Sequence, residues 1–446
     1  MKKITSKPLL VLYACSGLGV NMLNLIVGSY LCSALIPDGF DKNVEHWTYL
    51  NKELVVAELW IVLSVIAKIV DGLIDLPFSH FADNLKTRWG RRRPALLMGY
   101  VPMVLAYLLF LVPLQSNATV LNTVWFAFCL CVFYGAYTLT MLTYYATFAE
   151  ITGSAKDIDL LSNIKSVCDV VYFSLSFVLV PLFVGMGINI RNVAVIFLPL
   201  SLTMMIPMFL LKEKPLAGKH ATALEEANTS DRVTLFRSIS FTFQDKAYIG
   251  WLCILFVMNM GLQLFLSGIN EYFSTLGLNM PFIMPACFAP VPFTILLYNK
   301  ILRTKGMGFA YRYVLIVFSA AMTLMSFCKL IPSSIQTVYA ILCGVMVSFS
   351  IGAFFAVTYS IPSHRAALRK AENTAASSMY FAIQGLFEAA SAGLGGSAIL
   401  VLLKKTGGVK FTTAVVAALC MAAFGLSFLL PKGITQIGLT GESRKK

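Results

Sequence analysis

Long stretches of uncharged apolar residues dominate the chain. Residues 95–114 read ALLMGYVPMVLAYLLFLVPL, and residues 313–328 and 411–431 are likewise uncharged. A helix needs about 20 apolar residues to cross the hydrocarbon core of a bilayer. Only helices and closed barrels satisfy their backbone hydrogen bonds there, and barrel strands alternate in polarity over ~10 residues, which these stretches do not. The sequence therefore predicts an all-α membrane protein.

The charge of the chain has two possible origins. Of its 446 residues, 58% are hydrophobic and only 13% are charged, yet the net charge is +14. Soluble domains carry about 25% charged residues. Nucleic-acid binding needs a basic surface on a soluble core, and the apolar stretches leave no such core. We therefore expect no nucleic-acid partner, and we attribute the charge to basic residues on one side of a lipid bilayer.

Hydropathy predicts twelve membrane spans, and one long polar segment divides six of them from the other six. The spans are 8–36, 54–82, 95–114, 120–150, 160–186, 191–212, 248–274, 282–302, 313–330, 337–360, 374–403 and 411–431. The corresponding domains are an N-terminal six-helix bundle over 1–212, a cytoplasmic linker over 213–247, a C-terminal six-helix bundle over 248–431 and a cytoplasmic tail over 432–446.

Basic residues are sorted between the loops. Twelve spans place both termini on one side of the membrane, and 26 of the 35 Lys and Arg residues fall on that side, against 7 on the other. The positive-inside rule then predicts cytoplasmic termini and a multi-pass protein of the plasma (inner) membrane. The loops NLKTRWGRRRP and NKILRTKGMGFAYR also form a weak internal repeat, and repeated halves are common in secondary transporters.

The ten cysteines predict no metal or redox site. All lie in predicted spans, none forms a CxxC pair, and the four histidines are far apart in the chain. Structural zinc sites need closely spaced Cys and His ligands. We expect buried free thiols and no cofactor.

Three charged residues lie on one face of the second predicted span. Lys68, Asp71 and Asp75 follow at spacings of 3 and 4, so they share one helical face. Each costs ~2.5–3.5 kcal/mol in a span, which favours an inward orientation and mutual pairing. The alternative interpretation is a Lys–Asp ion pair whose only role is to hold two helices together. The second carboxylate favours a site that binds and releases a cation or a proton, and Na⁺ would need further oxygen ligands from another helix.

Other polar residues in spans are candidates for a substrate site. Lys165 and Asp169 form an i,i+4 pair, for which a buried structural pair and a substrate contact are equally good interpretations. Tyr137, Tyr144 and Tyr145 carry amphipathic rings. Such rings suit sugar-like ligands, and they also pack at crowded helix interfaces.

Two spans of the second half carry polar stripes on one face. One stripe consists of Asn259, Gln263, Ser267 and Asn270, with Glu271 beside it, and the other of Ser377, Tyr380, Gln384, Glu388 and Ser391. They predict the lining of a polar cavity. Hydrogen bonding between spans is the alternative interpretation, since it is common in membrane proteins.

The stretch DGLIDLPFSHFADNLKTRWGRRRP resembles the signature of the glycoside–pentoside–hexuronide:cation symporters. That signature has an Asp, a second Asp four residues later, then Ala-Asp and an aromatic-Gly-basic cluster ending in Pro. The matching residues are Asp71, Asp75, Ala82, Asp83, Arg88, Trp89, Gly90, Arg91, Arg93 and Pro94. The fourth span resembles the family at Tyr144, Ala146, Glu150 and Thr152. The specific motifs lie mainly in residues 10–155.

This resemblance implies a major facilitator fold with twelve transmembrane helices in two pseudo-symmetric bundles. It also implies symport of a small solute, often a glycoside, with a coupling ion that is Na⁺ or H⁺. By resemblance, Asp71 and Asp75 hold this ion, Thr138 supplies a hydroxyl ligand, and Lys68 is the basic residue beside the first Asp. A metal ion, where one binds, would be Na⁺ at the two aspartates.

The sequence departs from the family at several positions. Asn21 and Met141 stand where the melibiose carrier has sugar-binding carboxylates, and Ile74 replaces an Asn-like ligand. A basic residue of the family falls near Glu388. These departures leave both a galactoside substrate and the choice between Na⁺ and H⁺ open, whereas Tyr145 aligns with an aromatic sugar-stacking position.

Our first hypothesis is therefore a monomeric cation- or proton-coupled symporter of a sugar-like or glycoside-like small molecule, working by alternating access. The expected substrate contacts are Asn21, Tyr137, Tyr144, Tyr145, Lys165, Asp169, Asn259, Gln263, Gln384 and Glu388. The expected cytoplasmic gate consists of Asp83, Arg88, Gly90, Arg91, Arg92 and Arg93. The alternatives are a carrier of a lipid-like or amphipathic solute and a non-transporting receptor. No nucleophile motif or metal cluster in the sequence suggests an enzyme.

Overall fold

The computed structural model is helical almost throughout. It describes residues 4, 6–40, 43–85, 87, 89–90, 92–151, 155–211, 240, 242–278, 280–369 and 377–436. No β-strand occurs among these residues, and an isolated bridge joins Thr87 to Gly90. The predicted all-α class is thus confirmed.

Packing divides the chain into two compact units. The first comprises Met1–Pro37, Glu45–Ser176 and Met186–Arg232, and the second comprises Asp38–Val44, Phe177–Gly185 and Val233–Lys446. The predicted limits of the bundles, linker and tail stay predictions. Residues 212–239, 241 and 437–446, which make up most of the predicted linker and tail, lie outside the described residues.

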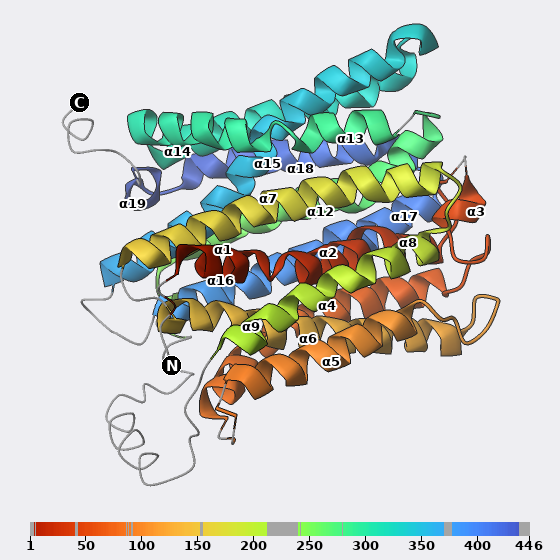
Figure 1. Cartoon of the computed structure of the whole chain (residues 1–446). Coiled ribbons are helices and arrows are strands. Elements are labelled where there is room, and N and C mark those ends of the chain that lie inside the picture. Colours follow the sequence, from red (N-terminus) through yellow and green to blue (C-terminus); the bar gives the residue numbers. More distant parts are fainter. Residues whose placement is uncertain are drawn as a thin grey trace. The chain divides into compact units, whose positions relative to one another are not determined.

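The first half of the chain contains several broken helices (Figure 1). In order, the elements are α1 (Lys7–Cys15), α2 (Leu18–Ile26), η1 (Val27–Leu31), η2 (Ser33–Leu35), α3 (Val44–Trp47), α4 (Ala57–Asn84), α5 (Arg92–Phe110), α6 (Val120–Ile151), α7 (Ala155–Gly185), α8 (Ile190–Phe197), η3 (Leu198–Met204) and α9 (Met205–Leu210). The π-helix η1 continues α2 directly, and Ser16 and Gly17 separate α1 from α2.

The second half contains longer helices. They are α12 (Lys246–Thr275), α13 (Met280–Phe288), α14 (Val291–Ser326), η4 (Phe327–Leu330), α15 (Ser333–Arg369), α16 (Ser377–Ala392), η6 (Gly393–Ile399), α17 (Leu400–Lys405), η7 (Val409–Phe411), α18 (Thr412–Leu426), η8 (Ser427–Leu429) and α19 (Lys432–Thr435). Within α14, Gly306 has non-helical angles (φ 80°, ψ 169°), so two helices meet there. This break lies between the predicted spans 282–302 and 313–330.

Ten helical segments of the described chain are long and apolar enough to cross a membrane. Two more helices correspond to the remaining predicted spans. One is α4, which carries Lys68, Asp71 and Asp75, and the other is α7, whose apolar part is the shorter segment Val171–Gly185. Each of the twelve predicted spans therefore has a helical counterpart, as expected of a multi-pass membrane protein.

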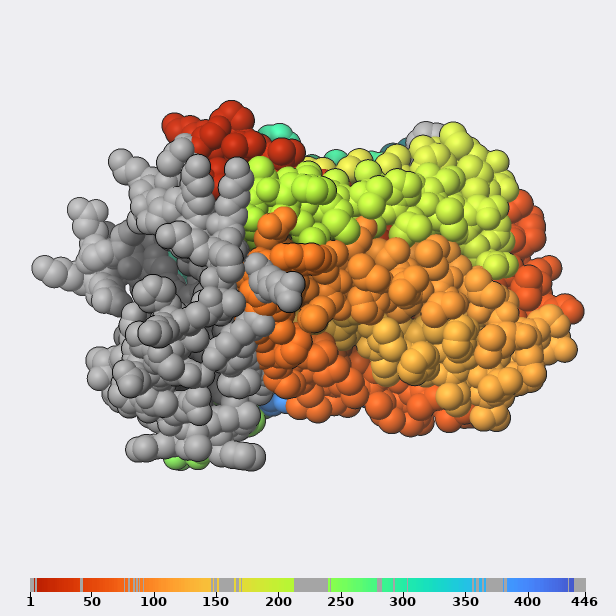
Figure 2. All heavy atoms as spheres, turned by 60° about the horizontal axis from the view of Figure 1, so that its bottom comes forward, coloured from red at the N-terminus to blue at the C-terminus, as the bar shows by residue number. Residues whose placement is uncertain are grey.

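The outward surface of the first unit is apolar. On α5 and α6, Leu105 is 55% exposed and Phe128 is 58% exposed. Figure 2 shows this surface, where α5 and α6 lie beside residues 190–210, and Leu202 and Phe209 of that segment are also exposed. Large exposed apolar areas are rare on water-soluble proteins, so hydrocarbon is the expected surrounding of these helices.

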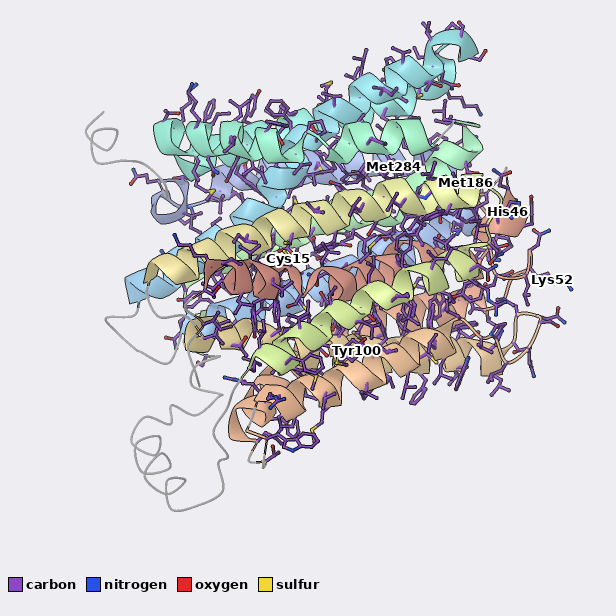
Figure 3. All side chains as sticks on the ribbon, in the orientation of Figure 1. Cys15, His46, Lys52, Tyr100, Met186 and Met284 are labelled. Carbon is purple, nitrogen blue, oxygen red and sulfur yellow. The ribbon has the colours of Figure 1, made fainter. Side chains whose placement is uncertain are left out.

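Close helix packing fixes the first span against η3. A Cβ added to Gly19 would lie 1.8 Å from the carbonyl oxygen of Leu200, so the two backbones approach too closely for any side chain. Tyr100 of α5 also reaches η3, where its hydroxyl lies 3.0 Å from that of Ser201 (Figure 3). These contacts hold α2, which carries Asn21, in a fixed position within the first unit.

We predict that Gly19→Ala destabilises the protein by about 1–3 kcal/mol, the usual cost of overpacking, because backbone atoms must move apart. The matched control is Gly250→Ala in α12, where an added Cβ meets nothing within 4 Å. Thermal unfolding of the purified protein measures both variants. Equal melting temperatures for the two would contradict the close approach.

Candidate functional site

The Asp71 carboxylate of α4 faces α6 within the first unit. The Asp71 Oδ1 atom accepts a 2.8 Å hydrogen bond from the Thr138 hydroxyl. Thr138 is buried, and Asp75 lies half-buried one turn further along α4. The structure thus brings a carboxylate and a hydroxyl together, which are oxygen ligands of the kind that hard cations bind.

The ammonium group of Lys68 lies over an aromatic ring. Its Nζ atom is 3.5 Å from the ring centroid of Tyr134, and Tyr134 is itself 1% exposed. No carboxylate of the described residues lies within ion-pair distance of Lys68. A cation above an aromatic face gains about 2 kcal/mol or more where water is excluded. Tyr134 therefore holds the charge of Lys68 while the Asp71 oxygen bonds to Thr138.

Tyr134 was not among the residues that sequence reasoning selected. Tyr134 and Thr138 are four residues apart on α6, and Lys68 and Asp71 are three apart on α4, so each pair shares one helical face. The two faces meet in register. The α6 spacing was visible in the sequence, but its pairing with α4 was not.

Four of the predicted substrate residues form one hydrogen-bonded network in the first unit. The Tyr137 hydroxyl donates to Asn21 Oδ1 at 2.9 Å. Asn21 Nδ2 in turn donates to Asp169 Oδ1 at 3.4 Å, and Lys165 forms an ion pair with the same carboxylate. The network thus connects the first, fourth and fifth predicted spans.

The network is buried at one end and open at the other. Asn21 and Lys165 are buried, at 3% and 6% exposure. The Asp169 side chain is 40% exposed, and Tyr145 is 43% exposed, with its ring centroid 5.3 Å from the Lys165 ammonium. The exposed carboxylate and ring are the parts of the network that a solute can reach.

Tyr144 supports the break in the first span. Its hydroxyl donates to the carbonyl oxygens of Tyr13 at 2.7 Å and Ala14 at 3.0 Å, and the ring is fully buried. The last carbonyls of a helix have no partner inside the helix. Thr203 likewise donates to the Ser16 carbonyl at 2.8 Å. These hydroxyls stabilise the turn at Ser16 and Gly17 that precedes Asn21.

The second unit contains a separate network between α12 and α16. Asn259 Nδ2 donates to the Glu388 carbonyl at 3.0 Å and to the Ser391 hydroxyl at 2.7 Å. Gln384 donates to Glu388 Oε1 at 3.0 Å and accepts from Trp251 Nε1 at 3.2 Å. Gln263 lies half-buried one turn along α12 from Asn259. The polar stripes therefore do form hydrogen bonds between helices, as their second interpretation expects.

The family assignment follows from the whole sequence. The family model described as MFS/sugar transport protein matches residues 12–433. The chain belongs to this MFS/sugar transport family. The family resemblance carried by the motif in residues 71–94 is confirmed at this level. No curated protein sequence matches the chain.

Solved structures of other transporters share the fold of this MFS protein. The nucleoside transporter NupG is 16% identical, with a TM-score of 0.59 over 96% of this chain and 98% of that one. A POT family transporter in complex with 5-aminolevulinic acid is 12% identical, with a TM-score of 0.62 over 96% and 97%. A bacterial homolog of the human lysosomal transporter Spinster is 14% identical, with a TM-score of 0.58 over 96% and 98%. The protein is a membrane transporter of the MFS type.

Only part of the predicted gate of this MFS transporter is described. Arg88, Arg91 and the side chain of Asp83 lie outside the described residues. Gly90 has φ +92° and is buried in a tight turn, where its carbonyl accepts from the Thr87 hydroxyl at 2.6 Å. Arg92 is 5% exposed at the start of α5, and Arg93 is half-buried. The role of these residues as a cytoplasmic gate stays a prediction.

Two buried ion pairs of the MFS transporter were missed by sequence reasoning. Lys404 lies 3.1 Å from Glu271, and both side chains are at most 1% exposed. Arg365 binds both carboxylate oxygens of Asp245 at 2.6 to 2.9 Å, and the Tyr380 hydroxyl donates to Asp245 at 3.1 Å. A glutamate in an apolar span requires a partner, and this is the sequence signal by which the first pair could have been found.

We predict that Tyr134→Leu destabilises the transporter by about 1–2 kcal/mol, a value between those of exposed and desolvated cation–π contacts, because the half-buried Lys68 ammonium loses its contact with the aromatic ring. Tyr134→Phe keeps the ring and is the matched control, expected to retain most of the stability. Thermal unfolding in detergent measures both. Equal stability of the Leu and Phe variants would rule out the ring as the host.

Proposed function

We propose that the protein is a cation- or proton-coupled symporter of a sugar-like or glycoside-like solute, working by alternating access. The observation that carries this proposal is the arrangement of Asp71 on α4. Its carboxylate bonds to Thr138, while Lys68, three residues away, lies over the Tyr134 ring. Asp71 lies half-buried within a span, and no ion pair joins it to Lys68 in the part of the chain that the structure describes. Such a carboxylate favours a site for a mobile cation.

The oxygen atoms around this site suit the proposed coupling ion. Na⁺ is a hard cation that prefers carboxylate and hydroxyl ligands, and Asp71, Asp75 and Thr138 supply them. A proton needs a single carboxylate oxygen. Both ions remain part of the proposal, and the experiment below distinguishes them.

The network of the first unit supports a substrate rich in hydroxyl groups. Asp169 accepts hydrogen bonds, Asn21 and Tyr137 both donate and accept, and the exposed Tyr145 ring offers an apolar face. Sugars combine hydroxyl groups with apolar ring faces, which aromatic side chains cover. The matched family is described as sugar transport, and a nucleoside, the substrate class in the name of NupG, is itself a pentose glycoside.

The proposed setting of this transport is the plasma membrane, with both termini in the cytoplasm. The uneven distribution of Lys and Arg between the predicted loops supports this orientation. We propose that the protein acts as a monomer and that the basic loop before α5, with Arg92 and Arg93, contributes to a cytoplasmic gate.

The test is uptake into proteoliposomes that contain the full-length protein. Labelled melibiose, xylose, glucuronic acid and uridine are offered under an imposed Na⁺ or H⁺ gradient. We expect at least one probe to accumulate, and we expect Asp71→Asn and Asp75→Asn to abolish accumulation because each removes a negative charge from the cation site. Glu58→Gln, in the first turn of the same helix, is the matched control and retains uptake.

Other outcomes would overturn the proposal. Unchanged uptake in both aspartate variants would exclude the coupling role of α4. Movement of a labelled lysolipid but of none of the four probes would favour a carrier of amphipathic solutes. A folded protein that moves no probe under either gradient would favour a receptor.

The hydroxyl of Thr138 gives a finer prediction. Thr138→Val keeps the shape but removes the donor to Asp71 and one oxygen ligand, so the cation concentration for half-maximal uptake should rise about tenfold, equivalent to ~1.4 kcal/mol. Thr138→Ser keeps the hydroxyl and should stay close to the wild-type value. A Val variant with unchanged cation dependence would remove Thr138 from the site.

A further inference from the structure

The second unit contains a buried charge pair that the proposed mechanism does not use. Glu271 of α12 and Lys404 of α17 lie 3.1 Å apart, with side chains that are 0% and 1% exposed. Burying two charges costs more than their attraction returns unless further hydrogen bonds satisfy them. Here Oε1 of Glu271 accepts from Lys404, but Oε2 has no hydrogen-bond partner among the described residues.

The other buried pair of the same unit is fully satisfied. Asp245 receives Arg365 on both oxygens, the Tyr380 hydroxyl on Oδ2 and the backbone N–H of Tyr248 on Oδ1. Each carboxylate oxygen of Asp245 therefore accepts at least two hydrogen bonds. The contrast marks Glu271 as a carboxylate with spare capacity, which native proteins rarely bury without a functional reason.

A strap formed by Asp38, Gly39 and Phe40 covers the pair. A Cβ added to Gly39 would lie 3.5 Å from Lys404 Cγ and 3.6 Å from Glu271 Cβ. The Phe40 ring centroid is 4.9 Å from the Lys404 ammonium. The Asp38 carboxylate, 45% exposed, forms a 3.3 Å ion pair with Lys405. Adjacent lysines of α17 therefore contact the buried glutamate on one side and the strap on the other.

The chemistry of this place suits a proton better than a metal ion. The ammonium of Lys404 repels a metal cation from Glu271, and no group of three His, Cys, Asp or Glu residues that could hold a metal occurs in the described part of the chain. A proton adds to a single oxygen. Among the described residues, the other charged groups close to Glu271 on neighbouring elements are Lys405, Asp38 and Lys410 of η7, which is exposed and lies over Phe411.

We propose that Glu271 is a protonation site of the transport cycle, separate from the α4 carboxylates. The proton is bound by the Oε2 atom, which neutralises Glu271 and releases its hold on Lys404. Lys404 keeps its own proton and its positive charge. The Phe40 ring and the Asp38 carboxylate are the groups on the strap that can contact the released Lys404 ammonium. Protonation is thereby converted into a change of contacts between α17 and the strap. The role in a cycle rests on the proposed function.

The binding of the proton is tested without a substrate. Infrared difference spectra of the full-length protein in lipid nanodiscs are recorded between alkaline and acidic buffer. We expect a band of a protonated carboxyl group that is lost when Glu271→Gln and Lys404→Met are combined. The double variant removes both charges, so it avoids leaving a buried lysine without a countercharge. The matched control, Asp245→Asn with Arg365→Gln, keeps this band.

The role in transport is tested with the probe that the proteoliposome assay identifies. We expect the Glu271→Gln, Lys404→Met variant to lose accumulation driven by a proton gradient but to keep counterflow, because exchange needs no net proton movement. If the pair were purely structural, the double variant would keep both proton-driven accumulation and counterflow.

Two results would overturn the inference: an unchanged carboxyl band, or wild-type accumulation in the double variant. If the wild-type protein accumulates no probe, the proposed function fails. In that case the infrared result still decides whether Glu271 binds a proton.

Discussion

Burial of charge away from water is the constraint on which the rest of this structure depends. A charged side chain within a bilayer costs several kcal/mol unless other groups replace its water. The chain meets this cost in different ways. The Tyr134 ring contacts the Lys68 ammonium, and Asp169, one turn away on the same helix, pairs with Lys165. A glutamate from another helix pairs with Lys404. In the proposed function, the nearby Asp71 binds another cation.

The same constraint separates polar groups that support the fold from those that we propose to contact a ligand. Tyr144 is fully buried, and its hydroxyl donates to two backbone carbonyls of the first span. It therefore stabilises the break in that span. Asp169 and Tyr145 are about two-fifths exposed, although they belong to the same part of the first unit. A solute that binds here would meet a carboxylate and a ring that the buried members hold in place.

The spans were predictable because apolar length and the sorting of basic residues are properties of the sequence alone. Lys165 and Asp169 were candidates for a similar reason, since charged groups within apolar spans need partners. Tyr137 was selected for its amphipathic ring, and Asn21 by its place in the family resemblance. Their connection into one network was not predictable, because it depends on which spans pack together. Tyr134 was missed because only the packing of α4 on α6 gives it a cation. Lys404 precedes Thr406 and two glycines, so the sequence predicts a loop residue, whereas the structure places it in α17.

The central claim is that the α4 carboxylates bind a mobile cation. The most direct measurement needs no substrate: the charge displaced when the Na⁺ or H⁺ concentration is raised over a solid-supported membrane carrying the full-length protein. The account predicts a transient current for one of the two ions, and its loss when Asp71 and Asp75 are both changed to Asn. No current for either ion, or an undiminished current in the double variant, would contradict it.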